Sequence, residues 1–147
     1  MCAQIFLVPR NPVTGYFNSV QVAVEWLVAL CFLVVGLSHI LQPRAWAEFF
    51  TRFREKDAVG SLQLGLLHLP LALLIVAFHN IWRGIPLVVT LIGWSQLLKS
   101  FLYLSYPAHG LRMLGYVSVE KSWRFVAAGI FSVAGSLLLA FWLATTQ

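Results

Sequence analysis

Four long apolar runs constrain this sequence more than any other feature. Each is long enough to cross the hydrocarbon core of a bilayer, which takes about 20 helical residues. Transmembrane β-strands would instead appear as alternating segments of about 10 residues, and the sequence has none. The sequence therefore predicts an all-α fold, a four-transmembrane-helix bundle forming one domain over 1–147, with spans at about 20–42, 59–80, 85–106 and 123–145.

The composition agrees with a membrane protein. Hydrophobic residues make up 60% of the chain and charged residues 10%, whereas about a quarter of a typical soluble domain is charged. Cys2 and Cys31 are too few and too far apart for a disulfide framework or a thiolate metal cluster. These numbers exclude a soluble enzyme and a small secreted domain.

Basic residues are distributed unevenly between the two sides of the predicted bundle. Arg10 and Arg83 lie on one side, and seven basic residues lie in or beside the first and third connections: Arg44, Arg52, Arg54, Lys56, Arg112, Lys121 and Arg124. Cytoplasmic loops carry such an excess. We therefore expect a multi-pass protein of a bacterial inner (plasma) membrane, with both termini outside and these connections cytoplasmic. Anionic lipid head groups account for the surplus positive charge without nucleic acid as a partner.

The first connection carries an amphipathic pattern over 44–56. Aromatic residues recur there at the spacing of one helix face: Trp46, Phe49, Phe50 and Phe53. The pattern predicts a short helix along the membrane interface, with this aromatic face as its anchor in lipid. The alternative is that the same face docks on a neighbouring subunit. We expect the segments before Ser19 and around "GLRMLG" (110–115) to be a retained tail and a loop.

Ionisable residues inside the spans are costly and therefore informative. On the first span, Glu25 and His39 share a helical stripe, and on the second His68 and His79 do the same. The very short connection after the second span makes the second and third spans antiparallel neighbours. Depth along the spans then permits a pair between Glu25 and either His79 or Arg83.

The third span adds three polar residues on one face, and Pro70 interrupts the hydrogen bonding of the second. We expect Pro70 to face other helices as part of a kinked, hydrated patch with His68. We name the whole predicted set the polar seam: Glu25, His39, His68, His79, Arg83, Gln96, Lys99 and Tyr103.

Three functions are consistent with such a seam. The first is structural: an accessory or scaffold subunit that assembles with itself or with other membrane subunits, since hydrogen bonds and small residues hold helices together in lipid. The second is a small proton- or ion-conducting transporter that uses Glu25 and the histidines. The third is a membrane subunit that binds haem or another tetrapyrrole. Its metal ligands would be His39 and His68, and the sequence offers no other candidates that we favour. No catalytic motif is present, so we favour a non-enzymatic protein and predict no catalytic residue and no required cofactor.

Two segments, "GLSHILQPRAWAEFF" and "FHNIWRGIPLVVTLIGWSQLLKSFLYLSYP", resemble those of small, uncharacterised bacterial four-helix membrane proteins. The pattern G-L-x-x-x-x-x-P at the end of the first span is also loosely similar to the DoxX-like group. The residues that carry the likeness are His79, Asn80, Trp82, Thr90, Gly93, Trp94 and Lys99. This resemblance implies a fold and a topology, and no activity.

Overall fold

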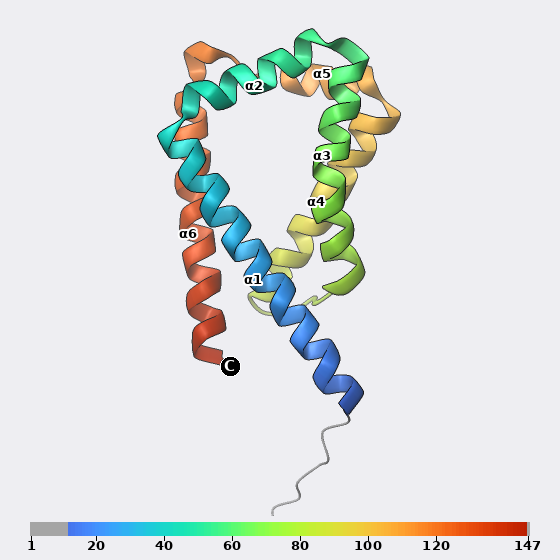
Figure 1. Cartoon of the computed structure of the whole chain (residues 1–147), viewed down its shortest axis with the longest axis vertical. Helices are drawn as coiled ribbons and strands as arrows, with labels where there is room; N and C mark the ends of the chain where they lie inside the picture. Colours follow the sequence, from blue (N-terminus) through green and yellow to red (C-terminus); the bar gives the residue numbers. More distant parts are fainter. Residues whose placement is uncertain (1–11, 147) are drawn as a thin grey trace, which may run out of the picture.

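The chain folds into helices throughout the part that its computed structural model describes, which is the backbone of residues 12–146 and the side chains of 19–146. The elements are α1 (Pro12–Leu41), α2 (Pro43–Glu55), α3 (Asp57–Phe78), α4 (Pro86–Ser105), α5 (Pro107–Leu114), the short 3-10 helix η1 (Val119–Lys121) and α6 (Trp123–Thr146). Figure 1 shows four long helices with α2 lying across one end of them. The predicted all-α four-helix bundle is confirmed.

Four helices are long and apolar enough to cross a membrane: Ser19–Leu41 of α1, and the whole of α3, α4 and α6. The chain is therefore a multi-pass membrane protein, and the predicted spans agree with these helices to within about two residues. The segment before Ser19 is not a tail throughout, because α1 already begins at Pro12. A proline suits a first helical turn, where its missing N–H costs nothing. Residues 1–11 lie outside the described part.

The four long helices form two pairs. α1 packs along α6 and α3 packs along α4, whereas contacts between the pairs are few. In the first pair the backbones approach closely, since a Cβ on Gly129 would lie 2.6 Å from the carbonyl oxygen of Gly36. In the second pair a Cβ on Gly93 would lie 2.4 Å from the Ile75 side chain. Small residues thus give each pair its dispersion contacts, which replace the hydrophobic drive that lipid removes.

Serine hydroxyls reinforce each pair by donating hydrogen bonds to backbone carbonyls of the facing helix. Ser136 donates to Ala29 at 2.6 Å, and Ser132 to Phe32 at 2.9 Å, between α6 and α1. Between α3 and α4 the bonds run in both directions: Ser61 donates to Tyr103 and Ser100 to Gly65, each at 2.8 Å. Because each donor has one acceptor at a fixed level, these bonds set the axial register of each pair.

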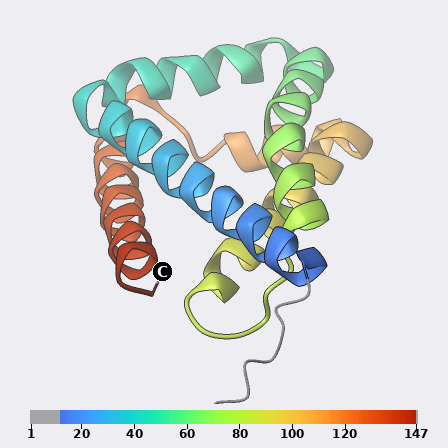
Figure 2. The same cartoon turned by 60° about the horizontal axis from the view of Figure 1, so that its bottom comes forward.

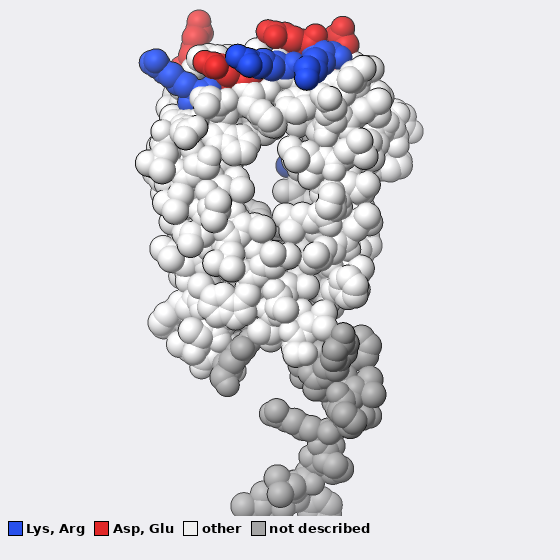
Figure 3. Space-filling model, viewed as in Figure 1, with Lys and Arg blue, Asp and Glu red and all other residues white. Residues whose placement is uncertain are grey.

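The two pairs meet at their two ends. At one, the Glu25 end, an apolar cluster draws on all four long helices: Val24, Val28, Ala29, Ile75, Val89, Leu139 and Leu143. At the other, the α2 end, α2 extends from one pair to the other. Figure 3 shows an opening between the pairs beneath α2, and it shows charged side chains gathered at the α2 end. The bundle is therefore closed at its ends and open between them.

The aromatic face of α2 packs on the chain itself, which corrects the predicted lipid anchor. Phe49, Phe50 and Phe53 surround the buried cluster of Leu64, Tyr103 and Leu114. The remaining anchor residue, Trp46, donates an indole hydrogen bond to the Ser38 hydroxyl at 2.9 Å. The helix itself is where the sequence predicts it. Its aromatic face turns inward because the ends of the two pairs offer an apolar surface that would otherwise remain uncovered.

The predicted loop after α4 is also partly wrong, because residues 107–114 form helix α5. Gly110 permits this helix to pack tightly: a Cβ there would lie 2.3 Å from the Tyr103 ring and 2.7 Å from the Ser61 hydroxyl. Arg54 then donates to the carbonyls of Leu114 and Val117, each at 3.4 Å. α2 and α5 are thus joined at the α2 end.

Replacing Phe53 by Ala tests the role of this aromatic face. We expect the free energy of unfolding in mild detergent to fall by about 1–2 kcal/mol, because a half-buried aromatic contact is lost. Glu48→Ala, on the exposed face of the same helix, is the matched control and should change it by less than about 0.5 kcal/mol. Equal effects of the two substitutions would show that the aromatic face contributes nothing to closing the bundle.

Candidate functional site

A buried carboxyl–imidazole pair links the two helix pairs at the Glu25 end. Glu25 projects from α1, and His79 follows α3 as its C-cap with an extended backbone. The exposed fraction is 2% for Glu25 and 0% for His79. Glu25 Oε1 lies 2.8 Å from His79 Nε2. The pairing of these two residues, one of the two that the sequence permits, is therefore present.

Thr90 completes the pair into a network of three side chains. Its hydroxyl lies 3.2 Å from Nδ1 of His79 and is fully buried on α4. The same oxygen accepts the backbone N–H of Ile81 at 3.0 Å and lies 3.0 Å from the Ile81 carbonyl oxygen, to which it can donate. The polar seam does not include Thr90. Its position one turn after Pro86, beside the short connection that carries His79, is the signal that could have identified it.

The hydrogen bonds of the network can be arranged in two ways, depending on which nitrogen of His79 carries a proton. In one, Thr90 donates to the Ile81 carbonyl and accepts from Nδ1–H of His79. In the other, Thr90 donates to Nδ1, and Nε2–H of His79 donates to the Glu25 carboxyl. In both, the imidazole and the hydroxyl are fully bonded, which is the condition for burying such groups. The contacts of the network connect α1, the end of α3 and α4.

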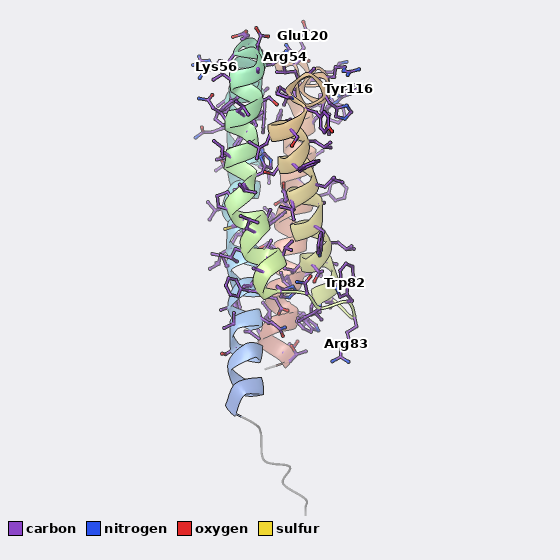
Figure 4. The ribbon with its side chains drawn as sticks, turned by 90° about the vertical axis from the view of Figure 1, so that its right-hand side faces the viewer. Arg54, Lys56, Trp82, Arg83, Tyr116 and Glu120 are labelled. Carbon is purple, nitrogen blue, oxygen red and sulfur yellow. The ribbon has the colours of Figure 1, made fainter. Side chains whose placement is uncertain are left out.

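A small cavity of about 280 Å³ adjoins the network at the Glu25 end. Its polar lining comes from Gln21, Glu25 and Thr146, and its apolar lining from Val22, Ile81, Pro86 and Trp142. Glu25 therefore borders this cavity as well as contacting His79. Arg83 takes no part in this arrangement: Figure 4 shows Trp82 and Arg83 at the far end from Arg54 and Glu120, with Arg83 pointing away from the bundle.

Four further seam residues belong to the α3–α4 pair, His68 on α3 and Gln96, Lys99 and Tyr103 on α4. His68 Nδ1 lies 2.8 Å from the carbonyl oxygen of Leu64, so the imidazole is bonded to its own helix, and its ring lies 6.0 Å from that of Tyr103. Lys99 is half-buried and within electrostatic range of His68. The Oε1 atom of Gln96 is the one buried side-chain oxygen or nitrogen of the described residues that has no hydrogen-bond partner. Among the described residues, no hydrogen bond joins these four side chains to the Glu25 network.

The surroundings of Pro70 differ from those that the sequence predicts. Its side chain is exposed and α3 continues through it without a break. Pro70 therefore does not face other helices as predicted, whereas His68 is half-buried and lies beside Tyr103 of α4. Because Pro70 faces outward, the contacts between α3 and α4 are undisturbed. The helical hydrogen bond that the proline cannot donate is lost on the lipid side of α3.

His39 forms a third, separate group at the α2 end. Its ring centroid lies 4.4 Å from that of Trp46 on α2 and 5.5 Å from that of Phe125 on α6. His39 and His68 consequently belong to different helix pairs and contact different partners. The residues of the predicted polar seam thus lie in three separate groups, with Arg83 outside all three, because the two helix pairs diverge between their ends.

Comparisons of the chain with protein-family models, with curated proteins and with solved structures found no match. The resemblance to DoxX-like proteins stays a prediction.

A double-mutant cycle measures the link between Glu25 and His79. We expect His79→Leu to lower the free energy of unfolding by about 1–3 kcal/mol, because the Glu25 carboxyl is left buried without its partner. Glu25→Leu should cost a similar amount. The double variant should lose less than the sum of the two single losses, since neither polar group remains. Additive losses, measured by unfolding in mild detergent, would mean that the two residues do not stabilise each other.

Proposed function

We propose that the chain is a non-enzymatic integral membrane protein that acts as an accessory or scaffold subunit of a membrane complex or of a homo-oligomer. The observation that carries this proposal is how the buried polar groups are used. The buried serines donate to facing helices, and Glu25, His79 and Thr90 bond to one another. Polar groups committed to helix–helix bonds favour a structural role over a reactive one.

The energetics of helix association in lipid agree with this role. Hydrogen bonds between membrane helices contribute on the order of 0.6 kcal/mol each, so several are needed to fix one arrangement. In this chain they hold two pairs that contact each other mainly at their ends. Such a bundle has most of its apolar side surface available to lipid or to other helices, since only 22–28% of the residues in an apolar 18-residue stretch of each span are buried.

The conducting alternative has less support from the same geometry. A relay needs titratable groups within hydrogen-bond reach of one another or of bridging water along the whole span. Glu25 and His79 satisfy this at one end. His68 bonds to Leu64, and His39 lies against Trp46 and Phe125 at the other end. The separation of these groups favours the scaffold.

For the membrane arrangement we propose a bacterial inner membrane with the α2 end cytoplasmic and both termini outside. The charge distribution supports it: basic residues gather at the α2 end, whereas Arg83 lies at the Glu25 end. Anionic head groups would then neutralise the basic residues around α2.

Cysteine labelling in intact cells tests this orientation. In a background with Cys2→Ser and Cys31→Ser, Arg83→Cys should react with a membrane-impermeant maleimide because it is exposed on the outer side. Lys121→Cys, equally exposed at the α2 end, should react only after the cells are opened. The reverse pattern would place the α2 end outside.

Purification from native membranes in a mild detergent tests the scaffold proposal. We expect two differently tagged copies to co-purify, or one copy to retain a stoichiometric partner subunit, because the exposed side surface is available for assembly. Mass measurement of the purified particle distinguishes these two outcomes. A lone monomer that retains no partner, also after chemical cross-linking in the membrane, would contradict the proposal.

A further inference from the structure

Lys99 is a charged side chain inside a span, and it has no partner in the described part of the chain. It lies on α4 six residues before the helix ends at Ser105, which is about 9 Å from that end at about 1.5 Å per residue. It makes no hydrogen bond or ion pair with any described residue. An ionisable residue at this depth is costly, and such residues are almost always paired with another polar group. The surroundings of Lys99 therefore indicate what its partner is.

Lys99 lies on the side of α4 that faces the other helix pair. An apolar groove of about 780 Å³ lies between α4 and α6, with α1 as its floor, and Figure 2 shows the start of α4 lying apart from α6. Val88 and Ile92 line this groove, and Lys99 follows them on the same helix face, at spacings of four and seven residues. Figure 3 shows a basic side chain at the opening beneath α2, apart from the charged residues of the α2 end. Among the described Lys and Arg residues, Lys99 alone lies more than one turn inside a span, so its ammonium faces this opening.

The wall of the groove opposite α4 is built largely from small residues. Ala128, Ser132 and Ser136 of α6 line it at intervals of four residues, and Gly135 lies beside them. A Cβ added to Gly135 would meet nothing within 4 Å, so the chain itself does not cover this side of α6. Small residues at this spacing let the backbone of another helix approach closely. The wall therefore favours a helix as the occupant of the groove.

The depth of Lys99 distinguishes the possible sources of a negatively charged group. Figure 4 shows Arg54 and Lys56 at the α2 end, which is the level where basic residues meet lipid head groups. Lys99 lies deeper in the bundle, beneath α2, which extends across the opening. A lipid phosphate would have to leave the head-group level to reach Lys99. A carboxyl group on a transmembrane helix can lie at this depth without such a displacement.

A second copy of this chain does not offer that carboxyl group. Glu25 lies at the opposite end, and the other four acidic residues lie at the α2 end: Glu48, Glu55, Asp57 and Glu120. Asp57 begins α3 eight residues before Gly65, which the Ser100 hydroxyl contacts, so it lies about 12 Å from that level at about 1.5 Å per residue. Copies that share one orientation in the membrane therefore bring no carboxyl group to the level of Lys99.

We propose that the groove between α4 and α6 binds one transmembrane helix of a different protein, and that an Asp or Glu side chain of this helix pairs with Lys99. The inference rests on the proposed scaffold role and names the partner's chemistry: an apolar span with one carboxyl group about six residues from its end on the α2 side. The carboxyl group complements the unpaired ammonium, and the apolar lining around Val28 and Phe32 contacts the rest of the helix. Pairing at one level also sets the depth at which the partner binds.

Binding of a synthetic helix tests this site. The probe is a transmembrane peptide of about 20 leucine and alanine residues with one Glu six residues from one end, and its control has Gln at that position. Energy transfer between the full chain and each peptide is measured in phosphatidylcholine vesicles. We expect the Glu peptide to bind about tenfold more tightly, which corresponds to about 1.4 kcal/mol. Equal binding of the two peptides would overturn the proposal.

The same measurement in vesicles that contain phosphatidylglycerol tests an anionic head group as the partner of Lys99. We expect the preference for the Glu peptide to persist, because the phosphate lies at the head-group level. Loss of the preference in these vesicles would assign Lys99 to lipid and overturn the proposal.

Two matched pairs of variants locate the binding. Lys99→Met should remove the preference for the Glu peptide, whereas Lys56→Met, which removes the same charge at an exposed position of the α2 end, should leave it unchanged. Gly135→Phe should weaken the binding of both peptides by filling the groove, whereas Ala134→Phe, at an exposed position outside the lining, should weaken neither. A preference that persists in Lys99→Met, or binding that Gly135→Phe leaves unchanged, would overturn the proposal. A thermal unfolding scan confirms that each variant is folded.

Purification from native membranes separates a failure of this inference from a failure of the scaffold role. We expect a partner subunit with an acidic residue in its span to be retained by the unaltered chain and lost from Lys99→Met. A homo-oligomer that persists in Lys99→Met and retains no other subunit would leave the scaffold role standing and overturn the separate partner. A lone monomer would contradict both.

Discussion

The bond between Glu25 and His79 joins helices that otherwise have little contact. Lipid tails are as apolar as leucine side chains, so burying hydrocarbon between helices gains little, and specific bonds decide which arrangement forms. Within each pair, small residues and serine hydroxyls provide those bonds. Between the pairs, at the Glu25 end, the buried carboxyl–imidazole pair and the apolar cluster around Val28 and Ile75 provide them.

The opposite end is held by a different force. α2 carries charged residues on its outer face, and its aromatic face covers the cluster of Leu64, Tyr103 and Leu114. Water is accessible at this level, so burial of aromatic surface is favourable there in the ordinary way. The Glu25 end is thus joined by a buried hydrogen-bonded pair in apolar surroundings, and the α2 end by aromatic contacts beside charged residues. Neither kind of contact joins the two pairs between the ends, and there the pairs diverge.

The sequence predicts where the helices begin and end well, but it predicts poorly which side of each helix faces the protein. Both outcomes have one physical reason. Length and hydropathy identify a span whatever surrounds it, so α3, α4 and α6 appear at the expected residues. In a membrane the lipid-facing and protein-facing sides are both apolar, so hydrophobic periodicity does not distinguish them. Glu25 and His79 could be paired because charge is costly in lipid and the short connection fixed their depth. The inward face of α2 and the helix α5 depend on how the two pairs diverge, which no local pattern encodes.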